Sequence, residues 1–317
     1  MDLVYLVYLV YSFEYIVMNK SFLEYLFEED IANSEIYLSN MAKSFGDKAW
    51  FLKMIPDNID TIVDFGGGEG QFCEFFDAKA KLAGRSFKYI IIDNNPSFLK
   101  NALKKGFQGF ESFEDLKKSR EWNPDTTLLN MSSVIHEVYS YADEDHTVEE
   151  FWYALKGCKF KMIAIRDMSL GAGSYTEVPR DAVFYVYDNI FKSPKYIQRL
   201  ESFENVWGAI CSDESDRHRL VDVKRLIHFL IKYRYVENWE REVQENYLPL
   251  SQDKLQEWLT KKLGYKLIHK ESSKLPFYHK CWTKDFKLNI PDNNGYRKQF
   301  ADWLKSITTH IKWLAER

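Results

Sequence analysis

The stretch IVDFGGGEG, residues 62–70, joins an apolar run and an acid to a turn that contains four glycines. The apolar run predicts a buried strand that ends near Asp64. Glycine has no Cβ atom, so a ligand can approach the backbone of such a turn closely. The amides of the turn, together with the N-terminus of the helix expected after it, favour a negatively charged ligand group. The stretch therefore predicts a strand, a ligand-binding turn and a helix, in that order.

A second apolar run, YIIID at residues 89–93, also ends in an acid. In a doubly wound sheet, the acid at the end of the second strand is placed to bind the hydroxyls of a ribose. A strand, a glycine-rich turn, a helix and a second strand with a terminal acid form one nucleoside-binding βαβ unit. The two runs together predict an α/β protein with a doubly wound sheet.

The spacing of the glycines distinguishes between two kinds of nucleoside cofactor. A dinucleotide site requires G-x-G-x-x-G. Counted from Gly66 or from Gly68, the third glycine would fall on Gln71 or on Cys73, so neither register fits. The run is instead D-x-G-x-G-x-G over residues 64–70. This spacing disfavours a nicotinamide-dependent oxidoreductase.

The run at residues 64–70 resembles motif I of the class I S-adenosylmethionine-dependent methyltransferases. Asp93 resembles the motif II acid of that family, which holds the ribose hydroxyls. The resemblance covers roughly residues 59–168 and 264–288. It implies S-adenosylmethionine as the cofactor and a central seven-stranded, mostly parallel sheet, with Glu111 and Phe113 near the adenine. The cofactor-binding residues that it predicts are Asp64, Gly66, Gly68, Glu69, Gly70, Asp93, Asn94, Glu111, Phe113, Asn130 and Ser132.

Two further runs, TTLLNMSSVIH at 126–136 and KMIAIRDM at 161–168, resemble the fourth and fifth strands of this family. The carboxyl ends of parallel strands meet at the ligand crevice, so their polar ends should line the methyl-transfer site. His136 is the candidate general base, because the pKa of histidine lies near neutrality. Alternatively, His136 begins the next helix and serves only to pack or orient it. Arg166 is predicted to contact the substrate or to form an internal ion pair.

The remaining elements are predicted from the helical spacing of apolar residues and from breaks at proline and glycine. A helical cap is expected before the first strand, and a helical insertion for substrate recognition between the fifth strand and a final antiparallel hairpin. The hairpin strands are expected at residues 265–269 and 278–282. The predicted units are a cap over 1–58, a methyltransferase core over 59–174 and 264–290, an insertion over 175–263 and a C-terminal helix over 291–317.

One helix of the insertion has a basic stripe. Lys224, His228 and Lys232 are spaced four apart and so share one helix face. Such a stripe favours an anionic or nucleotide-containing acceptor, such as a nucleic acid or an anionic small molecule. It is equally compatible with a solvated helix face. The remaining alternatives are a small-molecule methyltransferase with a helical lid, and a non-catalytic regulatory module that binds S-adenosylmethionine.

The composition of the chain limits the class of protein and the cellular compartment that we expect. The chain has 317 residues and a net charge of −4, which disfavours a wholly basic nucleic-acid coat protein. Its four cysteines are far apart and form no C-x-x-C pair, so we expect no metal site and a reducing cytoplasm. The apolar run at residues 3–11 is shorter than the span of about 20 residues that crosses a membrane, so no membrane partner is expected. It is read as an extra core element, or as residues upstream of a true start at Met18.

Overall fold

The computed structural model describes residues 45–120, 122–142, 145–175, 178–213, 219–235, 239–274 and 276–317. Most of the predicted cap at 1–58, including Met18, therefore lies outside the described residues. Its last part contains a helical turn at 45–48 and the short helix η1 (Leu52–Met54). Phe51 of this segment is completely buried and stacks on Phe76 of helix α4 (Gln71–Leu82), so the segment packs on that helix.

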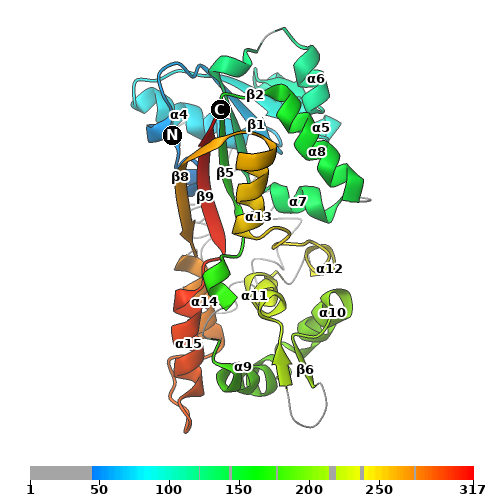
Figure 1. Ribbon diagram of the computed structural model, residues 1–317, viewed down its shortest axis with the longest axis vertical. Helices are drawn as coiled ribbons and strands as arrows, with labels where there is room; N and C mark the ends of the chain where they lie inside the picture. Colours follow the sequence, from blue (N-terminus) through cyan, green and yellow to red (C-terminus); the bar gives the residue numbers. More distant parts are fainter. Residues whose placement is uncertain are drawn as a thin grey trace.

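The upper half of the molecule in Figure 1 is built on one seven-stranded sheet. Its order is β3-β2-β1-β4-β5-β9-β8, and the first five of these strands are parallel. β9 runs antiparallel to both β5 and β8. The predicted mostly parallel, seven-stranded α/β sheet is thus confirmed. The strands are β1 (Thr61–Phe65), β2 (Lys88–Ile92), β3 (Gln108–Phe110), β4 (Thr127–Ser132), β5 (Met162–Met168), β8 (Lys266–Ser273) and β9 (His310–Glu316).

Both faces of the sheet are buried, as its apolar strands require. Successive residues point to opposite faces, so Ile62 and Leu128 join one hydrophobic cluster and Val63 and Leu129 join another. Helices complete both clusters. They are α4 (Gln71–Leu82), α5 (Pro96–Lys104), α6 (Phe113–Lys118), α7 (Ile135–Ser140), α8 (Asp145–Cys158), α13 (Gln252–Glu257) and the following η5 (Trp258–Lys262), with the short η2 (Pro124–Thr126) before β4.

The predicted final hairpin is wrong in its second strand. Residues 278–282 lie in helix α14 (Pro276–Asp285), and the strand that pairs with β8 is β9. The predicted C-terminal helix over 291–317 is correspondingly shorter, because helix α15 covers only Tyr296–Ser306. β9 lies between two strands and is buried on both faces, so its apolar residues do not alternate with polar ones. Such a run cannot be distinguished from a buried helix by its period.

A helical half lies below the carboxyl ends of the strands in Figure 1. It is built from two chain segments, the predicted insertion and the long β8–β9 connection, which share one hydrophobic cluster. The last part of the predicted insertion does not belong to it, since Leu255 and Leu259 pack with the sheet. The elements of the helical half are η3 (Ala172–Tyr175), α9 (Arg180–Val186), η4 (Tyr187–Phe191), α10 (Ile197–Trp207), β6 (Cys211–Asp213), β7 (Arg219–Val221), α11 (Val223–Lys232), α12 (Trp239–Glu242), α14 and α15.

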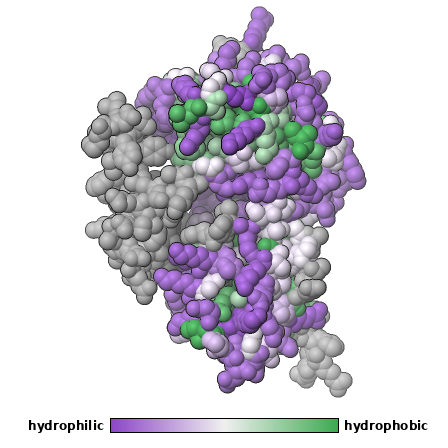
Figure 2. Space-filling view, turned by 90° about the vertical axis from the view of Figure 1, so that its left-hand side faces the viewer, coloured by the Kyte–Doolittle hydropathy of each residue, from purple (hydrophilic) through white to green (hydrophobic). Residues whose placement is uncertain are grey.

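The two halves differ on the face of the molecule that Figure 2 shows. In Figure 2, apolar side chains gather mainly over the half that contains the sheet, whereas the helical half is mostly hydrophilic. None of the helices in the described ranges is long and apolar enough to cross a membrane.

Candidate functional site

The glycine-rich turn leaves β1 in a conformation that side chains rarely adopt. Gly66, Gly68 and Gly70 have φ values of 69°, 55° and 84°, in the left-handed region that glycine tolerates. A Cβ atom on Gly66 would lie 2.6 Å from Cγ2 of Val134, in the loop after β4. The turn therefore packs directly against the loop that leads to His136, and a larger residue at position 66 would force Val134 or the turn to shift.

Asp93 joins the ends of the first two strands. One oxygen of its carboxylate accepts a hydrogen bond from the backbone amide of Gly68, at 2.9 Å, and the other accepts one from the amide of Asn95, also at 2.9 Å. The carboxylate is half-buried, and carboxylate oxygens can accept further hydrogen bonds. The predicted nucleoside-binding acid thus stands beside the predicted glycine turn.

Asp64 is buried below this turn. Burial raises its pKa to about 6, although Asn130 and the nearby Lys48 both lower it. The Nδ2 atom of Asn130 donates to Oδ1 of Asp64 at 2.7 Å. Oδ1 of Asn130 and Oγ of Ser132 are buried without a hydrogen-bond partner in the described part of the chain. Buried polar atoms are usually satisfied, so these two indicate where a bound ligand would supply partners.

Four other residues were predicted to bind the cofactor, and the structure places their side chains in different surroundings. Glu69 accepts a hydrogen bond from Nδ2 of Asn101 at 2.7 Å, which holds its side chain toward α5. Asn94 and Glu111 are exposed after β2 and β3. Phe113, predicted near the adenine, has a ring that is 3% exposed and stacks on Phe65 with centroids 4.9 Å apart. As the first residue of α6, it turns into the core rather than toward a ligand.

His136 and Asp167 form a buried pair at the ends of β4 and β5. Nδ1 of His136 lies 2.8 Å from Oδ1 of Asp167. The same carboxylate accepts hydrogen bonds from the backbone amides of Val134 (3.0 Å), Ile135 (2.7 Å) and Met168 (2.7 Å). His136 also lies in the first turn of α7, as the packing alternative predicted. Its position in the helix and its pairing with an acid therefore occur together.

The charges of this pair are coupled. Burial lowers the pKa of His136, but the charge of Asp167 and the hydrogen bond to it outweigh burial and raise that pKa above its usual value. Burial raises the pKa of Asp167, but His136 and the backbone amides outweigh this and lower it. With Nδ1–H donated to Asp167, Nε2 is the basic nitrogen of the neutral ring. Among the described residues, none forms a hydrogen bond with Nε2.

Arg166 forms an internal ion pair, the second of its two predicted alternatives. Its Nε donates to Asp47 at 2.6 Å, and Nη1 donates to Oγ of Ser133 at 2.8 Å. Asp47 also pairs with Lys312 of β9. These contacts fix the segment before η1 against the ends of β4, β5 and β9. Neither Asp47 nor its neighbour Lys48 lies in a recognisable motif, so neither residue could be predicted from the sequence.

The predicted basic stripe is not a single exposed face. Lys224 is exposed, but His228 is 3% exposed and Lys232 is completely buried. Nζ of Lys232 donates to the carbonyls of Glu242 and Glu245, and burial lowers its pKa to about 7. The pKa of His228 falls to about 2, first through burial and then through the charge of Lys232. The stripe faces the segment after α12 rather than solvent, so the expected role of His228 and Lys232 in binding an anion at the surface is corrected.

The helical half touches α7 through this segment. The ring of His136 packs edge-on against Tyr247, with centroids 5.3 Å apart. The hydroxyl of Tyr141 donates to the carboxylate of Glu245 at 2.5 Å, and the amide of Asn246 donates to Ser140 at 2.7 Å. Residues 245–247 therefore form one wall beside the His136–Asp167 pair.

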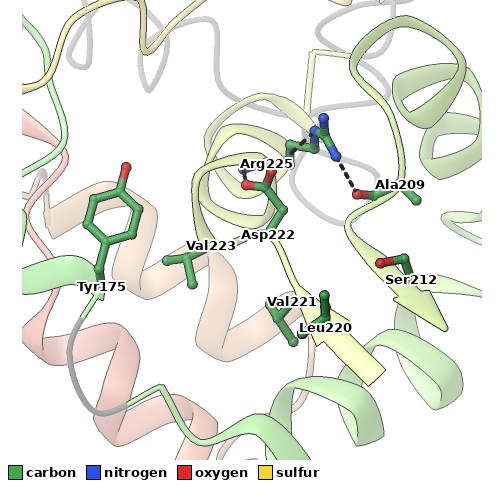
Figure 3. A pocket seen from close by; sticks show the side chains of 8 residues that line it. All are labelled: Tyr175, Ala209, Ser212, Leu220, Val221, Asp222, Val223 and Arg225. Atoms are coloured by element: carbon green, nitrogen blue, oxygen red, sulfur yellow. Dashed lines mark hydrogen bonds and ion pairs between the residues drawn. The ribbon is translucent and has the colours of Figure 1, made fainter. Parts of the chain in front are cut away.

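An open cavity of about 420 Å³ lies elsewhere, among η3, the β6–β7 pair and the start of α11 (Figure 3). None of the predicted site residues lines it. Its one lining cation, Arg225, donates to the carbonyl of Ala209 at 3.1 Å and pairs with Asp222 at 3.4 Å. The guanidinium of Arg225 is thus already bonded within the protein. No cluster of metal-ligating side chains occurs among the residues that the structure covers.

Comparison with known proteins gives structural likeness only. No protein-family model matches the chain, and no curated protein does. Phosphoethanolamine N-methyltransferase 2 of Haemonchus contortus, solved with S-adenosyl-L-methionine, has a TM-score of 0.42 and 13% identity; 93% of this chain is covered and 60% of that one. This chain thus spans less than two thirds of that protein. A putative sarcosine dimethylglycine methyltransferase from Galdieria sulphuraria has a TM-score of 0.42 and 11% identity. The match covers 86% of this chain and 85% of that one.

Proposed function

We propose that this protein is an S-adenosylmethionine-dependent methyltransferase in which His136 is the general base. The observation that carries the proposal is the arrangement at one edge of the sheet. The glycine turn, closed by Asp93, packs through Gly66 on the loop that leads to the His136–Asp167 pair. A nucleoside-binding turn and an oriented base are thus adjacent, as methyl transfer to a protonated acceptor requires.

The residues present fit this cofactor. A Cβ on Gly68 would meet only Oε1 of Gln71, at 3.9 Å, so a ligand group can approach the backbone there. The oxygens of Asn130 and Ser132 that lack a partner among the described residues lie on β4, the strand next to β1. Asp93 would hold the ribose hydroxyls, while Gly66, Gly68 and Asp64 would hold the amino acid end. When bound, S-adenosylmethionine supplies a methyl group on a positively charged sulfur, which is a good leaving group. The protein then has mainly to position the acceptor and remove its proton.

The His136–Asp167 pair is suited to that proton transfer. Asp167 holds the ring in one orientation and keeps the proton on Nδ1, so Nε2 can accept a proton from a hydroxyl or amine acceptor. The protonated ring that results is stabilised by the buried carboxylate 2.8 Å away. Asp167 is thus a positioning residue, and His136 is the group that contacts the acceptor.

For the acceptor, we propose a small molecule rather than a nucleic acid. The preference for an anionic or nucleotide-containing acceptor rested on the basic stripe, of which only Lys224 is exposed. Residues 245–247 instead wall the site beside His136 through contacts with α7. A helical half against the carboxyl ends of the strands is typical of a lid over a small acceptor.

The first test is calorimetric titration with S-adenosylmethionine, S-adenosylhomocysteine and NAD in parallel. We expect micromolar binding of the two sulfur nucleosides and no binding of NAD. If neither sulfur nucleoside binds, the proposed enzyme is wrong. A non-catalytic regulatory module would bind them equally well, so a screen for methyl transfer to metabolite pools is the second step, because only turnover distinguishes the two.

A further inference from the structure

Lys48 lies on a stretch of backbone that is fixed at the edge of the sheet. The preceding residue, Asp47, bonds to Arg166 at 2.6 Å and pairs with Lys312, and the following residue, Ala49, is buried. The chain at 47–49 is therefore held on both sides of Lys48 against the ends of β5 and β9. This places the side chain of Lys48 near the candidate site.

The ammonium of Lys48 lies among carboxylates that it does not bond. It is within electrostatic range of Asp64, Asp167 and Glu137, and the residue is half-buried. None of the residues in the described ranges forms a hydrogen bond or an ion pair with it. Burial, followed by the charge of Arg166, lowers the pKa of Lys48. A partly desolvated cation without a bonded partner is unfavourable, so a ligand that supplies an anionic partner would be stabilised here.

We propose that Lys48 binds the carboxylate of the cofactor's amino acid end, while Asp64 faces the ammonium of the same end. This inference rests on the proposed function. The amino acid end is a zwitterion, and Lys48 and Asp64 are opposite charges that interact electrostatically without a hydrogen bond or ion pair between them. Asp64 stands directly below the glycine turn, where the amino acid end is expected.

The other cations at this edge are already paired. Arg166 is held by Asp47 and Ser133, and Lys312 is paired with Asp47. Of these three cations in the described part of the chain, Lys48 is therefore the one that can turn to a bound carboxylate without breaking an ion pair. A charge-assisted bond of this kind is stronger than one between neutral groups.

The test compares two ligands on four proteins. S-adenosylhomocysteine has the amino acid end, whereas 5′-methylthioadenosine keeps the adenosine and the thioether but lacks that end. The proteins are the wild type, Lys48→Met, Lys48→Arg and the control Lys53→Met, whose lysine is exposed on the same segment. Thermal melting of each variant checks that it is folded.

We expect Lys48→Met to weaken binding of S-adenosylhomocysteine by about 10- to 100-fold, as for a lost hydrogen bond to a charged group. Binding of 5′-methylthioadenosine should be unchanged, Lys48→Arg should restore much of the affinity, and Lys53→Met should bind as the wild type does. Equal binding of S-adenosylhomocysteine by Lys48→Met and the wild type, or an equal loss for both ligands, would overturn the inference and leave the proposed function standing. If the wild type binds neither nucleoside, the proposed function fails, and the inference with it.

Discussion

Nδ1 of His136 lies 2.8 Å from Oδ1 of Asp167, and both side chains are almost completely buried. The other oxygen of Asp167 accepts the amides of Val134 and Ile135 at the start of α7. One buried carboxylate thus fixes both the imidazole and the loop that leads into its helix. That loop also packs on Gly66 of the glycine turn, so the candidate base and the candidate cofactor site are held in one arrangement.

Replacing His136 by Gln should lower kcat by a factor of about 10² to 10⁴, the usual contribution of a general base. Affinity for S-adenosylhomocysteine should stay near that of the wild type, since His136 is not in the predicted cofactor set. Steady-state kinetics on an identified acceptor, with calorimetry alongside, measures both quantities. An unchanged kcat would mean that His136 serves only to pack α7.

The pH profile of the wild type should show the raised pKa of His136. The base is active when neutral, so kcat/KM should rise with pH through a value above 6.5, the ordinary pKa of the group. Asp167→Asn removes the charge that raises this pKa and leaves burial, which lowers it. The rising limb should therefore move to lower pH in that variant, whereas a purely structural role for Asp167 would lower activity without moving the limb.

Asp93→Ala should weaken cofactor binding by about 1–3 kcal/mol, because the ribose hydroxyls lose a charged acceptor. The turn also loses the bond from the amide of Gly68, so a small drop in Tm should accompany the weaker binding. Calorimetry with S-adenosylhomocysteine measures the first effect. Asp57→Ala, which removes an exposed acid before β1, is the matched control and should bind normally. Unchanged affinity in Asp93→Ala would remove Asp93 from the site.

Gly66→Ala and Gly84→Ala form a matched pair at positive φ. Both alanines would be strained in the left-handed region, by roughly 1–2 kcal/mol. At Gly84 nothing lies within 4 Å of the added Cβ, but at Gly66 it would meet Val134 at 2.6 Å. We expect Gly66→Ala to destabilise the protein by a further 1–3 kcal/mol or so, as overpacking does, and to weaken cofactor binding. Equal denaturation midpoints for the two variants would contradict this.

Lys232 should make stability depend on pH above neutrality. Its pKa is about 7 in the folded protein and 10.5 as an ordinary lysine. Between these values the unfolded chain binds more protons than the folded one, so the contribution of this group to stability rises as pH rises. The Tm of the wild type relative to that of Lys232→Met should therefore increase from pH 7 to pH 9. The exposed Lys261→Met should show no such trend relative to the wild type.

The Asp47–Arg166 pair should show coupling in a double-mutant cycle. Each of Asp47→Asn and Arg166→Met should lower the free energy of unfolding, since the first leaves Arg166 without its carboxylate and the second leaves Asp47 with Lys312 alone. The double variant should be less destabilised than the sum of the two by about 0.5–3 kcal/mol, because the pair is lost only once. Denaturant titration measures the three values. Strict additivity would mean that the pair adds nothing to stability.

Some elements could be predicted because their signals are local. The strand, glycine turn and acid at residues 62–70 depend on neighbours in the chain, and the structure places them as expected. β9 could not be predicted in the same way. It pairs laterally with β5 and β8, and hydrophobic clusters cover both of its faces, so the run lacks the alternation that identifies a strand with one solvent-exposed face.

Side chains show the same contrast between local signals, which could be predicted, and tertiary packing, which could not. Helical spacing correctly placed His228 and Lys232 on one face of α11 but could not show that residues 242–247 cover that face. Phe113 follows β3 as expected, yet Phe65 and its neighbours draw the ring into the core. In each case the residue's position along its element was predictable, and what packed against it was not.

The βαβ unit at residues 61–92 and its glycine turn could be read from the sequence alone. Periodicity, glycine and terminal acids act over a few residues and leave their pattern in the chain. It took the folded chain to show that Asp167 orients His136, that Asp47 reaches Arg166 across 119 residues of sequence, and that Lys48 interacts electrostatically with Asp64 and Asp167. These relationships depend on how distant segments pack, because burial and electrostatic contact are set by neighbours in space rather than in sequence.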